Sequence, residues 1–553
     1  MAEGPSPQDA DKKKSRFSSI AVIAVVVIAA VAIGGAIGAY AYRQHLINKK
    51  DDNKIAQPAG KGSTGNPVES NGAPGSKYAA QFNTESMFPA FNPDRHQYVT
   101  RCVPGKVKVQ VKADPGSTVK VGPYPPDTGR FAAEARPLPG QDFNIIIDSD
   151  GETQTYQVRC LADDFPDWTY NRLKDPPKGM FFISERPEPK ETSRNWAIVF
   201  DQDGMPVWWF SPPTNTLGGQ ILPDGTFQIP RGFGDGYGKD PRTGSEIRSL
   251  DGKFKRLVTM KGAPTDGHEY TYLPNGNVIM NSYKPRKHVD LSSVGGPKDV
   301  GVYDGELQEI TPSGKIVWQW NSGDHVALSY TPQRWWKKIL RNAHPDPDGN
   351  EFIDIFHLNS AEPWGKYIVV STRHTDKVYG IDKKTGEIAW TFGGEPDAKS
   401  LKIVGGDPHA DYPIGGNHDA RITDGNLLSI HDNATYLNRP PRAVRYRLDI
   451  KAGTATYDGQ DLDPQVKESH CCGSVRKFGT GWIVSWGNNP LIDAFNSKDE
   501  LAFRMRVPIP AYRAVPVPES VTKADFNRAM DAMEIDPPMS DVPVNPIEHF
   551  GQN

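Results

Sequence analysis

The segment VYGIDKKTGEIAWTF, residues 378–392, contains the pattern that decides the fold. Polar and apolar residues alternate on either side of a turn at Gly386, and the second half ends on aromatic side chains. Alternation with a period of two is typical of β-strands, so the segment predicts a β-hairpin. The same pattern recurs in AIVFDQDGMPVWWF (197–210), EIRSLDGKFKRLV (246–258), LQEITPSGKIVWQW (307–320), YRLDIKAGTATY (446–457) and IDAFNSKDELAF (492–503).

A further hairpin precedes most of these six segments. Its turns are found at 223–225, 274–276, 364–365, 423–425 and 479–481. Two hairpins make a four-stranded sheet, and one such sheet alone has two open edges and a face that it cannot bury. Radial packing of successive sheets solves both problems, so we expect an all-β fold with a six-bladed β-propeller at residues 176–513.

Residues 79–175 are expected to form a small β-sandwich-like domain ahead of the propeller. Val107, Val109 and Val111 alternate with polar residues, and Cys102 and Cys160 each follow an apparent strand. A disulfide between these two cysteines is the expectation, with two unbridged buried thiols as the alternative. Disulfides persist in oxidising compartments, so the expected bridge places most of the chain outside the cytoplasm.

The N-terminal region predicts a membrane anchor. Residues 17–42 carry no charge and are rich in Ile, Val and Ala, and this run exceeds the roughly 20 residues that a helix needs to cross a bilayer. An uncleaved transmembrane signal anchor is favoured over a cleavable signal peptide, because the apolar run is long, and over a buried core helix, because basic residues flank it. We therefore expect a cytoplasmic tail at 1–16, a flexible linker at 43–78, and a single-pass protein of the cell membrane whose large domain is extracytoplasmic.

The C-terminal residues 514–553 are rich in proline on both sides of one predicted helix, near residues 521–533. Thr522 and Asp525 have the spacing of a capping box at the start of this helix. We expect the segment to form a strap on the propeller.

The overall charge argues against one class of partner. With 64 basic and 67 acidic residues the formal net charge is −3, so no bulk field attracts a polyanion. No nucleic-acid partner is expected, and nothing in the sequence indicates an oligomeric state.

Four of the 13 histidines occupy nearly the same position in the repeat. His268, His357, His418 and His470 lie 8, 8, 7 and 9 residues before the Gly of the following hairpin turn. The first strand of each blade lines the central channel of a propeller, so four imidazoles are expected to converge at one channel mouth. The alternative is a structural histidine that fixes the corner of its own blade, as in WD-type repeats, but the Trp-Asp partner of that arrangement is absent.

The neighbours of these histidines favour an anion over a metal ion. Imidazoles first suggest a transition metal. However, Arg373 is expected on the strand next to His357, and Asn359 two residues beyond His357 lies on the same strand face. A fixed guanidinium repels a cation and favours sulfate or phosphate, so neither a metal nor another cofactor is expected.

At these residues the sequence resembles the bacterial arylsulfate sulfotransferase family, and the similarity covers roughly residues 79–513. The motifs that carry the resemblance are GHEYTYLPNGNVIM (267–280), FHLNS (356–360), VVSTRHTDKVYGID (369–382) and GGNHDARITDGNLLSIHDN (415–433). The resemblance implies a six-bladed, extracytoplasmic enzyme that does not use the nucleotide sulfate donor. It would transfer a sulfuryl group from an aryl sulfate donor to a phenolic acceptor by ping-pong kinetics, without a metal.

The resemblance also implies roles for individual residues. His418 would be the nucleophile that becomes transiently sulfated, and His268, His357, Arg373 and Asn359 would hold the sulfuryl oxygens or move protons. Where the family pattern has a hydroxyl residue on the last blade, this chain has His470, Cys471 and Cys472. His470 and Cys472 are therefore the expected substrate contacts at that position.

Two other functions remain open at the level of sequence. A non-catalytic envelope propeller would bind a glycan, a lipid or a protein partner with its long loops. A quinoprotein dehydrogenase is the second alternative, because residues 382–390 resemble its propeller repeat and Cys471-Cys472 resembles its adjacent-cysteine disulfide. The pairing of His418 with Arg373 favours the sulfotransferase, since a binding module needs no such combination.

Overall fold

A computed structural model describes residues 80–102, 105–185, 195–212, 217–232, 242–345 and 351–533. The chain divides into two compact units, residues 1–55 and 56–553, and every described residue belongs to the second. The expected cytoplasmic tail, transmembrane anchor and linker at 1–78, and residues 534–553 of the strap, lie outside the described residues. Within the described ranges no helix is both long and apolar enough to cross a membrane.

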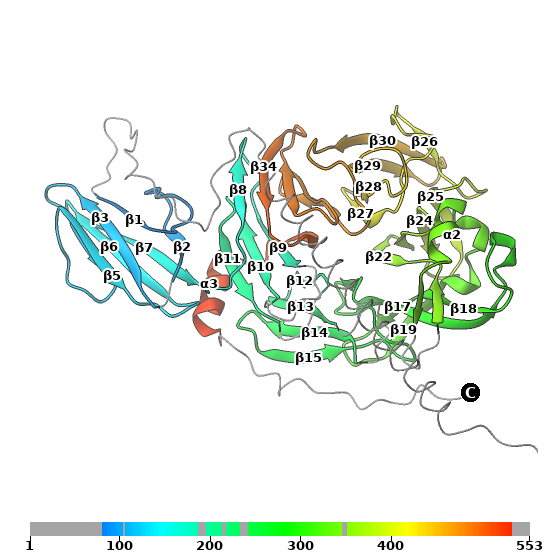
Figure 1. Ribbon diagram of the computed structural model, residues 1–553, viewed down its shortest axis with the longest axis horizontal. Helices are drawn as coiled ribbons and strands as arrows, with labels where there is room; N and C mark the ends of the chain where they lie inside the picture. The colour runs from blue at the N-terminus through cyan, green and yellow to red at the C-terminus, as the bar shows by residue number, and fades with distance from the viewer. Residues whose placement is uncertain are drawn as a thin grey trace, which may run out of the picture. The chain divides into compact units, whose positions relative to one another are not determined.

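The described part of the chain is almost entirely β-structure (Figure 1). Its two α-helices are α2 (Gln333–Ile339) and α3 (Lys523–Ala532). Six sheets with four antiparallel strands each follow one another along residues 169–516. The chain is therefore all-β with few helices, as the hairpin repeat predicts.

The strands of the first three of these sheets are β9 (Met180–Glu185), β10 (Ala197–Asp201), β11 (Pro206–Phe210) and β35 (Ala511–Pro516); β12 (Gln220–Ile221), β13 (Thr226–Arg231), β14 (Gly244–Ser249) and β15 (Phe254–Val258); and β16 (Tyr270–Tyr272), β17 (Val278–Val289), β18 (Val300–Ile310) and β19 (Ile316–Asn321), with β20 (Ala343–Pro345) and β21 (Glu351–Asp354) added. Those of the other three are β22 (Leu358–Trp364), β23 (Tyr367–Thr372), β24 (Lys377–Asp382) and β25 (Ile388–Gly393); β27 (His418–Thr423), β28 (Leu427–Asp432), β29 (Arg442–Asp449) and β30 (Thr454–Asp461), with β26 (Lys402–Val404) added; and β31 (Ser474–Phe478), β32 (Gly481–Ser485), β33 (Leu491–Phe495) and β34 (Leu501–Arg506), with β8 (Thr169–Arg172) added.

Each of the six repeated segments forms the outer hairpin of one sheet. The segment 378–392 becomes β24 and β25, and Gly386 takes a φ of 78° at its turn, in the left-handed region that glycine adopts most easily. All six outer hairpins have one register shift, which lies close to the turn in five of them and midway along the strands in the hairpin of β29 and β30. The repeat in the sequence is thus also a repeat of local geometry.

Neighbouring sheets contact one another in order, mostly through their innermost strands. β12 contacts β9, and direct contacts also join β22 to β27, β27 to β31, and β31 to β35. Two hydrogen bonds complete the series: Gln220 Nε2 donates to Tyr270 O (2.5 Å) between β12 and β16, and Thr271 Oγ1 donates to Ala361 O (2.7 Å) between β16 and β22. The arrangement is propeller-like (Figure 1).

The first sheet is completed from the other end of the chain. β35 pairs antiparallel with β9, so a C-terminal strand covers an edge that the N-terminal strand would otherwise leave open. The range 176–513 expected for the propeller therefore ends inside β35, which reaches Pro516.

Two sheets form the small domain. They contain β1 (Ala80–Thr84), β3 (Val107–Ala113) and β5 (Arg130–Ala135) on one side, and β2 (Gln97–Arg101), β4 (Thr118–Val121), β6 (Asp142–Ser149) and β7 (Glu152–Leu161) on the other. A shared core of alternating apolar side chains lies between them. The range 79–175 needs one correction, because β8 lies inside it but pairs with β34 of the last large sheet.

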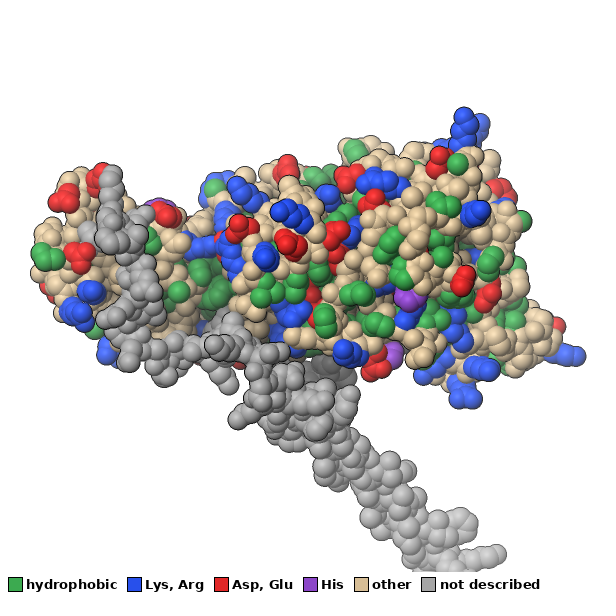
Figure 2. Space-filling view, turned by 90° about the horizontal axis from the view of Figure 1, so that it is seen from above, with side chains coloured by type: hydrophobic (Ala, Val, Ile, Leu, Met, Phe, Trp, Pro, Cys, Tyr) green, Lys and Arg blue, Asp and Glu red, His purple; other side chains and the backbone are tan. Residues whose placement is uncertain are grey.

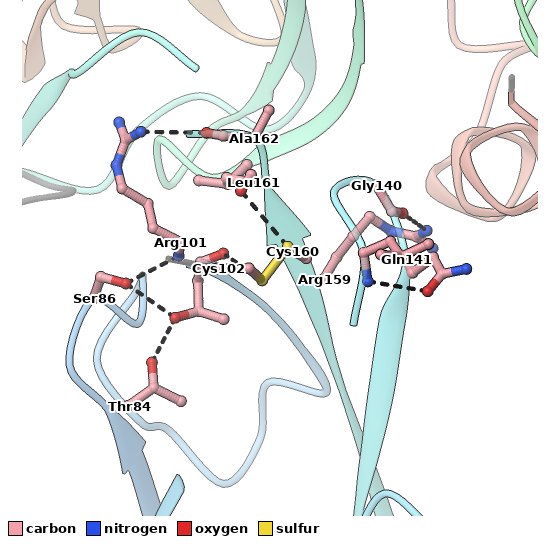
Figure 3. The surroundings of a disulfide bond; sticks show 12 residues. Thr84, Ser86, Arg101, Cys102, Gly140, Gln141, Arg159, Cys160, Leu161 and Ala162 are labelled. Atoms are coloured by element: carbon pink, nitrogen blue, oxygen red, sulfur yellow. Dashed lines mark hydrogen bonds between the residues drawn. A yellow bond between two sulfur atoms is a disulfide. The ribbon is translucent and has the colours of Figure 1, made fainter. Parts of the chain in front are cut away.

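Cys102 and Cys160 are joined by a disulfide with a Cα–Cα distance of 5.6 Å (Figure 3). The bond links the end of β2 to β7, which pair in parallel. Thr84, Ser86 and Thr100 form a chain of hydroxyl hydrogen bonds beside it.

The helix α3 begins where the capping box predicts it. The Thr522 side chain accepts from the Asp525 amide, and the Asp525 carboxylate accepts from the Thr522 amide (2.8 Å). Phe526 and Met530 face the same core as Trp208, which explains why this short helix stays attached to the first sheet. On the face seen in Figure 2, acidic and basic side chains are interspersed, as expected from the small net charge.

Candidate active site

Three of the four histidines in the repeat meet at the start of the innermost strands. His268 precedes β16, His357 precedes β22 and His418 begins β27. All three are buried, with exposed fractions of 2–7%. The ring centroids of His268 and His357 lie 5.2 Å apart, and Tyr283 contacts both rings.

Tyr512 connects His418 to the other two and was missed at the level of sequence. Its ring centroid lies 5.0 Å from that of His418 and 5.9 Å from that of His268. Tyr512 comes from β35, the closing strand, which no hairpin turn follows, so the spacing to a turn Gly could not find it. We call His268, His357, His418 and Tyr512 the histidine cluster.

Two aspartates orient His268 and His357. Asp266 Oδ2 lies 2.6 Å from His268 Nδ1, and Asp354 Oδ2 lies 2.5 Å from His357 Nδ1. A carboxylate beside Nδ1 keeps a proton there and leaves Nε2 as the nitrogen for substrate. The sequence carries a signal for these partners, because Asp266 lies two residues before His268 and Asp354 lies three residues before His357.

His418 is held as a neutral imidazole. Its Nδ1 lies 2.7 Å from Gly473 O, and because a carbonyl only accepts, Nδ1 carries the hydrogen. Burial first, and then the positive charge of Arg513, hold the pKa of His418 well below its ordinary value. Nε2 therefore has a lone pair, which accepts the Tyr512 hydroxyl at 3.0 Å.

Asn359 supports His418 through the backbone. Its Nδ2 donates to Asn417 O (2.9 Å), and its Oδ1 accepts from the Asp419 amide (3.2 Å). The side chain is fully buried and bonds to both neighbours of His418 in the sequence. This geometry positions the nucleophile expected at His418, and contact between Asn359 and a sulfuryl group stays a prediction.

Arg373 lies at the far side of His357, next to His374. Its guanidinium packs on the Trp335 ring at 4.7 Å from the centroid, and Nη1 lies 3.1 Å from His374 Nε2. His374 Nδ1 is bonded to Asp354 O (2.9 Å), and burial above all holds the pKa of His374 well below its ordinary value. The histidine cluster thus continues through His374 to one cation.

His470 does not join the cluster through its side chain. The His470 side chain is 53% exposed and faces Glu468, while its carbonyl accepts two donors from Arg373 (3.2 and 2.5 Å). The Sγ atoms of Cys471 and Cys472 lie 2.9 Å apart, longer than the roughly 2.05 Å of a disulfide. His470 lies nine residues before its turn Gly, whereas the other three histidines lie seven or eight residues before theirs. This longer spacing places its side chain away from the other three.

A second cluster lies beside the first along the same strands. Asp419 accepts hydrogen bonds from the guanidiniums of Arg421 (2.9 Å) and Arg476 (2.6 Å), and Arg513 Nε lies 3.0 Å from it in a third ion pair. Glu269 pairs with Arg421 at 2.7 Å. A cavity of about 360 Å³ is lined by these three arginines, Glu269 and His268. We call Glu269, Asp419, Arg421, Arg476 and Arg513 the arginine cluster.

One set of side chains among the described residues has the donor types of a metal site. Donor atoms of Asp354, His357 and His374 all lie within 4.8 Å of one another. Both histidines, however, direct Nδ1 at oxygen atoms of Asp354, and the Arg373 guanidinium lies against His374 Nε2. A guanidinium at that nitrogen occupies the ligand position and opposes a cation.

Comparison with known families now identifies the class of protein. The family described as Arylsulfotransferase (ASST) matches residues 223–507, which is more than half of the chain and includes every residue of the histidine cluster except Tyr512. The chain belongs to the arylsulfotransferase family. Membership indicates aryl sulfotransferase activity in general, with an aryl sulfate donor and a phenol acceptor.

Solved structures with similar folds are distant. They include a protein of unknown function from Bacteroides caccae (10% identity, 62% of this chain and 100% of that chain, TM-score 0.37) and a putative 6-phosphogluconolactonase from Bacteroides uniformis (11%, 62% and 100%, 0.37). A β-propeller domain from Myceliophteria thermophila has 12% identity, 61% and 88% coverage, and a TM-score of 0.33. No curated protein matches the chain significantly. Similarities at this level carry no argument about the site.

Proposed function

We propose that the chain is a six-bladed β-propeller enzyme that transfers a sulfuryl group from an aryl sulfate to a phenol through a sulfohistidine at His418. Family membership supports the general activity. The observation that carries the finer proposal is the buried neutral imidazole of His418, with its Nε2 lone pair beside two aspartate-paired histidines.

The first half-reaction forms the covalent intermediate. His418 Nε2 attacks sulfur, the bond from sulfur to the aryl oxygen breaks, and the phenolate leaves with that electron pair. Tyr512 must first release Nε2, and its hydroxyl has a second acceptor in His268 O at 3.5 Å. The departing oxygen takes a proton from an aspartate-paired histidine, His268 or His357.

The second half-reaction reverses these roles. The same histidine, now deprotonated, removes the proton of the acceptor phenol, whose oxygen attacks sulfur while the bond from sulfur to Nε2 breaks. Arg373 and the imidazole donors stabilise the charge on the sulfuryl oxygens in both steps. The scheme needs no metal and predicts ping-pong kinetics.

We further propose that residues 17–42 anchor the protein in the cell membrane with the catalytic domain outside the cytoplasm. The uncharged length of this segment supports anchoring. The Cys102–Cys160 disulfide supports an oxidising compartment for the domain that follows.

The sulfotransferase proposal is tested by trapping the intermediate. Purified protein is mixed with a chromogenic aryl sulfate in the absence of acceptor, and its intact mass is measured. We expect the addition of one sulfuryl group, located on His418 by peptide mapping and lost when a phenol is added. A turnover that never produces the adduct, or an adduct on another residue, would contradict the mechanism.

A further inference from the structure

Two of the proposed catalytic groups are held by the backbone of one four-residue segment. His470 O accepts the Arg373 guanidinium, and Gly473 O accepts His418 Nδ1. Between these carbonyls lie Cys471 and Cys472, with their sulfurs 2.9 Å apart. The adjacent cysteines therefore belong to the stretch of chain that positions both the proposed nucleophile, His418, and Arg373, which is proposed to stabilise the sulfuryl oxygens.

The geometry of this pair favours a bond that forms and breaks readily. Consecutive Cα atoms are about 3.8 Å apart, below the roughly 4.4–6.8 Å usual for disulfides, so a bridge between neighbours is strained. Strained disulfides have more oxidising potentials and are the labile ones. Cys472 already has a φ of 67°, so its backbone is in a region that side chains disfavour.

Hydrogen bonds connect the backbone beside Cys471 and Cys472 to the histidine cluster, so a backbone movement at the two cysteines would displace groups of that cluster. Asn433 Nδ2 donates to Cys472 O (3.0 Å), and the Gly473 amide donates to Tyr512 O (3.1 Å). The rings of His418 and Tyr512 are in contact. Gly473, which directly follows the pair, thus carries both the carbonyl bonded to His418 and the amide bonded to the strand of Tyr512, so a change in the backbone at Cys472 is passed to both.

We propose that Cys471 and Cys472 form a redox site, and that closing a disulfide between them shifts the carbonyls of His470 and Gly473 and lowers the rate of sulfuryl transfer. The predicted effect on rate rests on the proposed function, whereas the formation of the bridge does not. A shift of about 1 Å at a catalytic group can cost about 10²-fold in rate, so the device needs only a small movement.

The chemistry balances with a small-molecule disulfide as oxidant. Cys471, the partly exposed member of the pair, loses a proton, and its thiolate attacks the oxidant, which releases one thiolate. Cys472, deprotonated in turn, attacks the Cys471 sulfur of this mixed disulfide and releases the second thiolate. One disulfide has formed in the protein, the oxidant has become two thiols, and excess dithiol reductant reverses both steps.

The test uses the purified full chain before and after treatment with oxidised glutathione. Bridge formation is measured as a mass decrease of two hydrogens, assigned by peptide mapping, with Cys102–Cys160 as a marker present in both samples. We expect the turnover of a chromogenic aryl sulfate to fall at least about tenfold and to recover with dithiothreitol. In the control Cys471→Ser the rate before treatment serves as that variant's own baseline, and the oxidant should not lower it.

A second measurement separates this proposal from the proposed function. Hydrogen exchange of the peptide that contains Gly473 should become faster when the bridge forms, whatever the rate. The redox proposal is overturned if no mass change occurs, if exchange at Gly473 is unchanged, or if Cys471→Ser responds to the oxidant like wild type. Absence of turnover in both redox states, with the mass and exchange changes present, would instead overturn the sulfotransferase mechanism and leave the redox site in place.

Discussion

Consecutive residues on the innermost strands divide between the histidine cluster and the arginine cluster. In three pairs of consecutive residues, the first side chain belongs to the histidine cluster and the second to the arginine cluster. These pairs are His268 and Glu269, His418 and Asp419, and Tyr512 and Arg513. Most side chains of both clusters are buried. Those of the first are held by hydrogen bonds, whereas those of the second are charged and are held by ion pairs.

This difference separates chemistry from stability. Burial penalises a charge unless it is paired, so His418 stays neutral and retains a reactive lone pair. Burial also raises the pKa of Asp419, but the guanidiniums of Arg476, Arg421 and Arg513 more than offset this and hold it well below its ordinary value. We therefore expect substitutions in the histidine cluster to change the rate and those in the arginine cluster to change the stability.

The largest effect is expected for His418→Ala. Loss of the nucleophile should reduce aryl sulfate cleavage at least about 10⁴-fold, because no other group can form the intermediate. The melting temperature should change little, since an imidazole held by two hydrogen bonds contributes modestly to strand packing. Initial rates and thermal unfolding measure the two effects, and retained turnover in this variant would remove the mechanism.

Asp419→Asn should mainly lower the stability, whereas His418→Ala should mainly lower the rate. It leaves three guanidiniums, two of them buried, around a neutral amide, and breaking a buried pair in this way costs about 3–5 kcal/mol of the free energy of unfolding. The matched control is Asp458→Asn, which removes a surface partner of Arg447 (2.9 Å) and should cost only about 0–1 kcal/mol. Denaturant unfolding compares them, and equal small losses would show that the arginine cluster is not structural.

The sequence predicted the parts of this comparison that depend on a repeated pattern. Alternation and turn spacing were enough for the outer hairpins and for the convergence of His268, His357 and His418, because repeats place equivalent residues at equivalent positions. Asp266 and Asp354 lie within three residues of their histidines and were available to the same reasoning.

Contacts that depend on chain closure could not be found in this way. Tyr512 reaches His418 only because β35 pairs with β9 some 330 residues earlier in the sequence, and Asn359 bonds to the backbone of another sheet. His470 shared the spacing of the repeat without its geometry, since a loop of three residues separates it from β31. Spacing alone does not distinguish a side chain that enters the cluster from one that faces solvent.

Arg373→Ala tests the cation that lies next to the histidine cluster. Removing one donor to a developing oxyanion typically costs about 10²- to 10³-fold in rate, less than loss of the nucleophile. The sulfohistidine should still form slowly, so a mass measurement after long incubation should detect the adduct that His418→Ala never shows. A rate unchanged from wild type would show that another group stabilises the charge on the sulfuryl oxygens.

Tyr512→Phe is expected to have the smallest effect and tests how the nucleophile is released. Burial above all raises the pKa of the Tyr512 hydroxyl well above its ordinary value, so at neutral pH it acts as a hydrogen-bond donor to His418 Nε2. Because this bond must break before attack, its removal offsets part of the loss of a polar contact, and we expect the rate of adduct formation to change by no more than about tenfold. Rapid-quench measurement of the adduct gives this rate directly. A loss comparable to that of His418→Ala would instead make Tyr512 a proton donor in the reaction. Tyr512 would then serve the chemistry and its neighbour Arg513 the stability, as expected for His418 and Asp419.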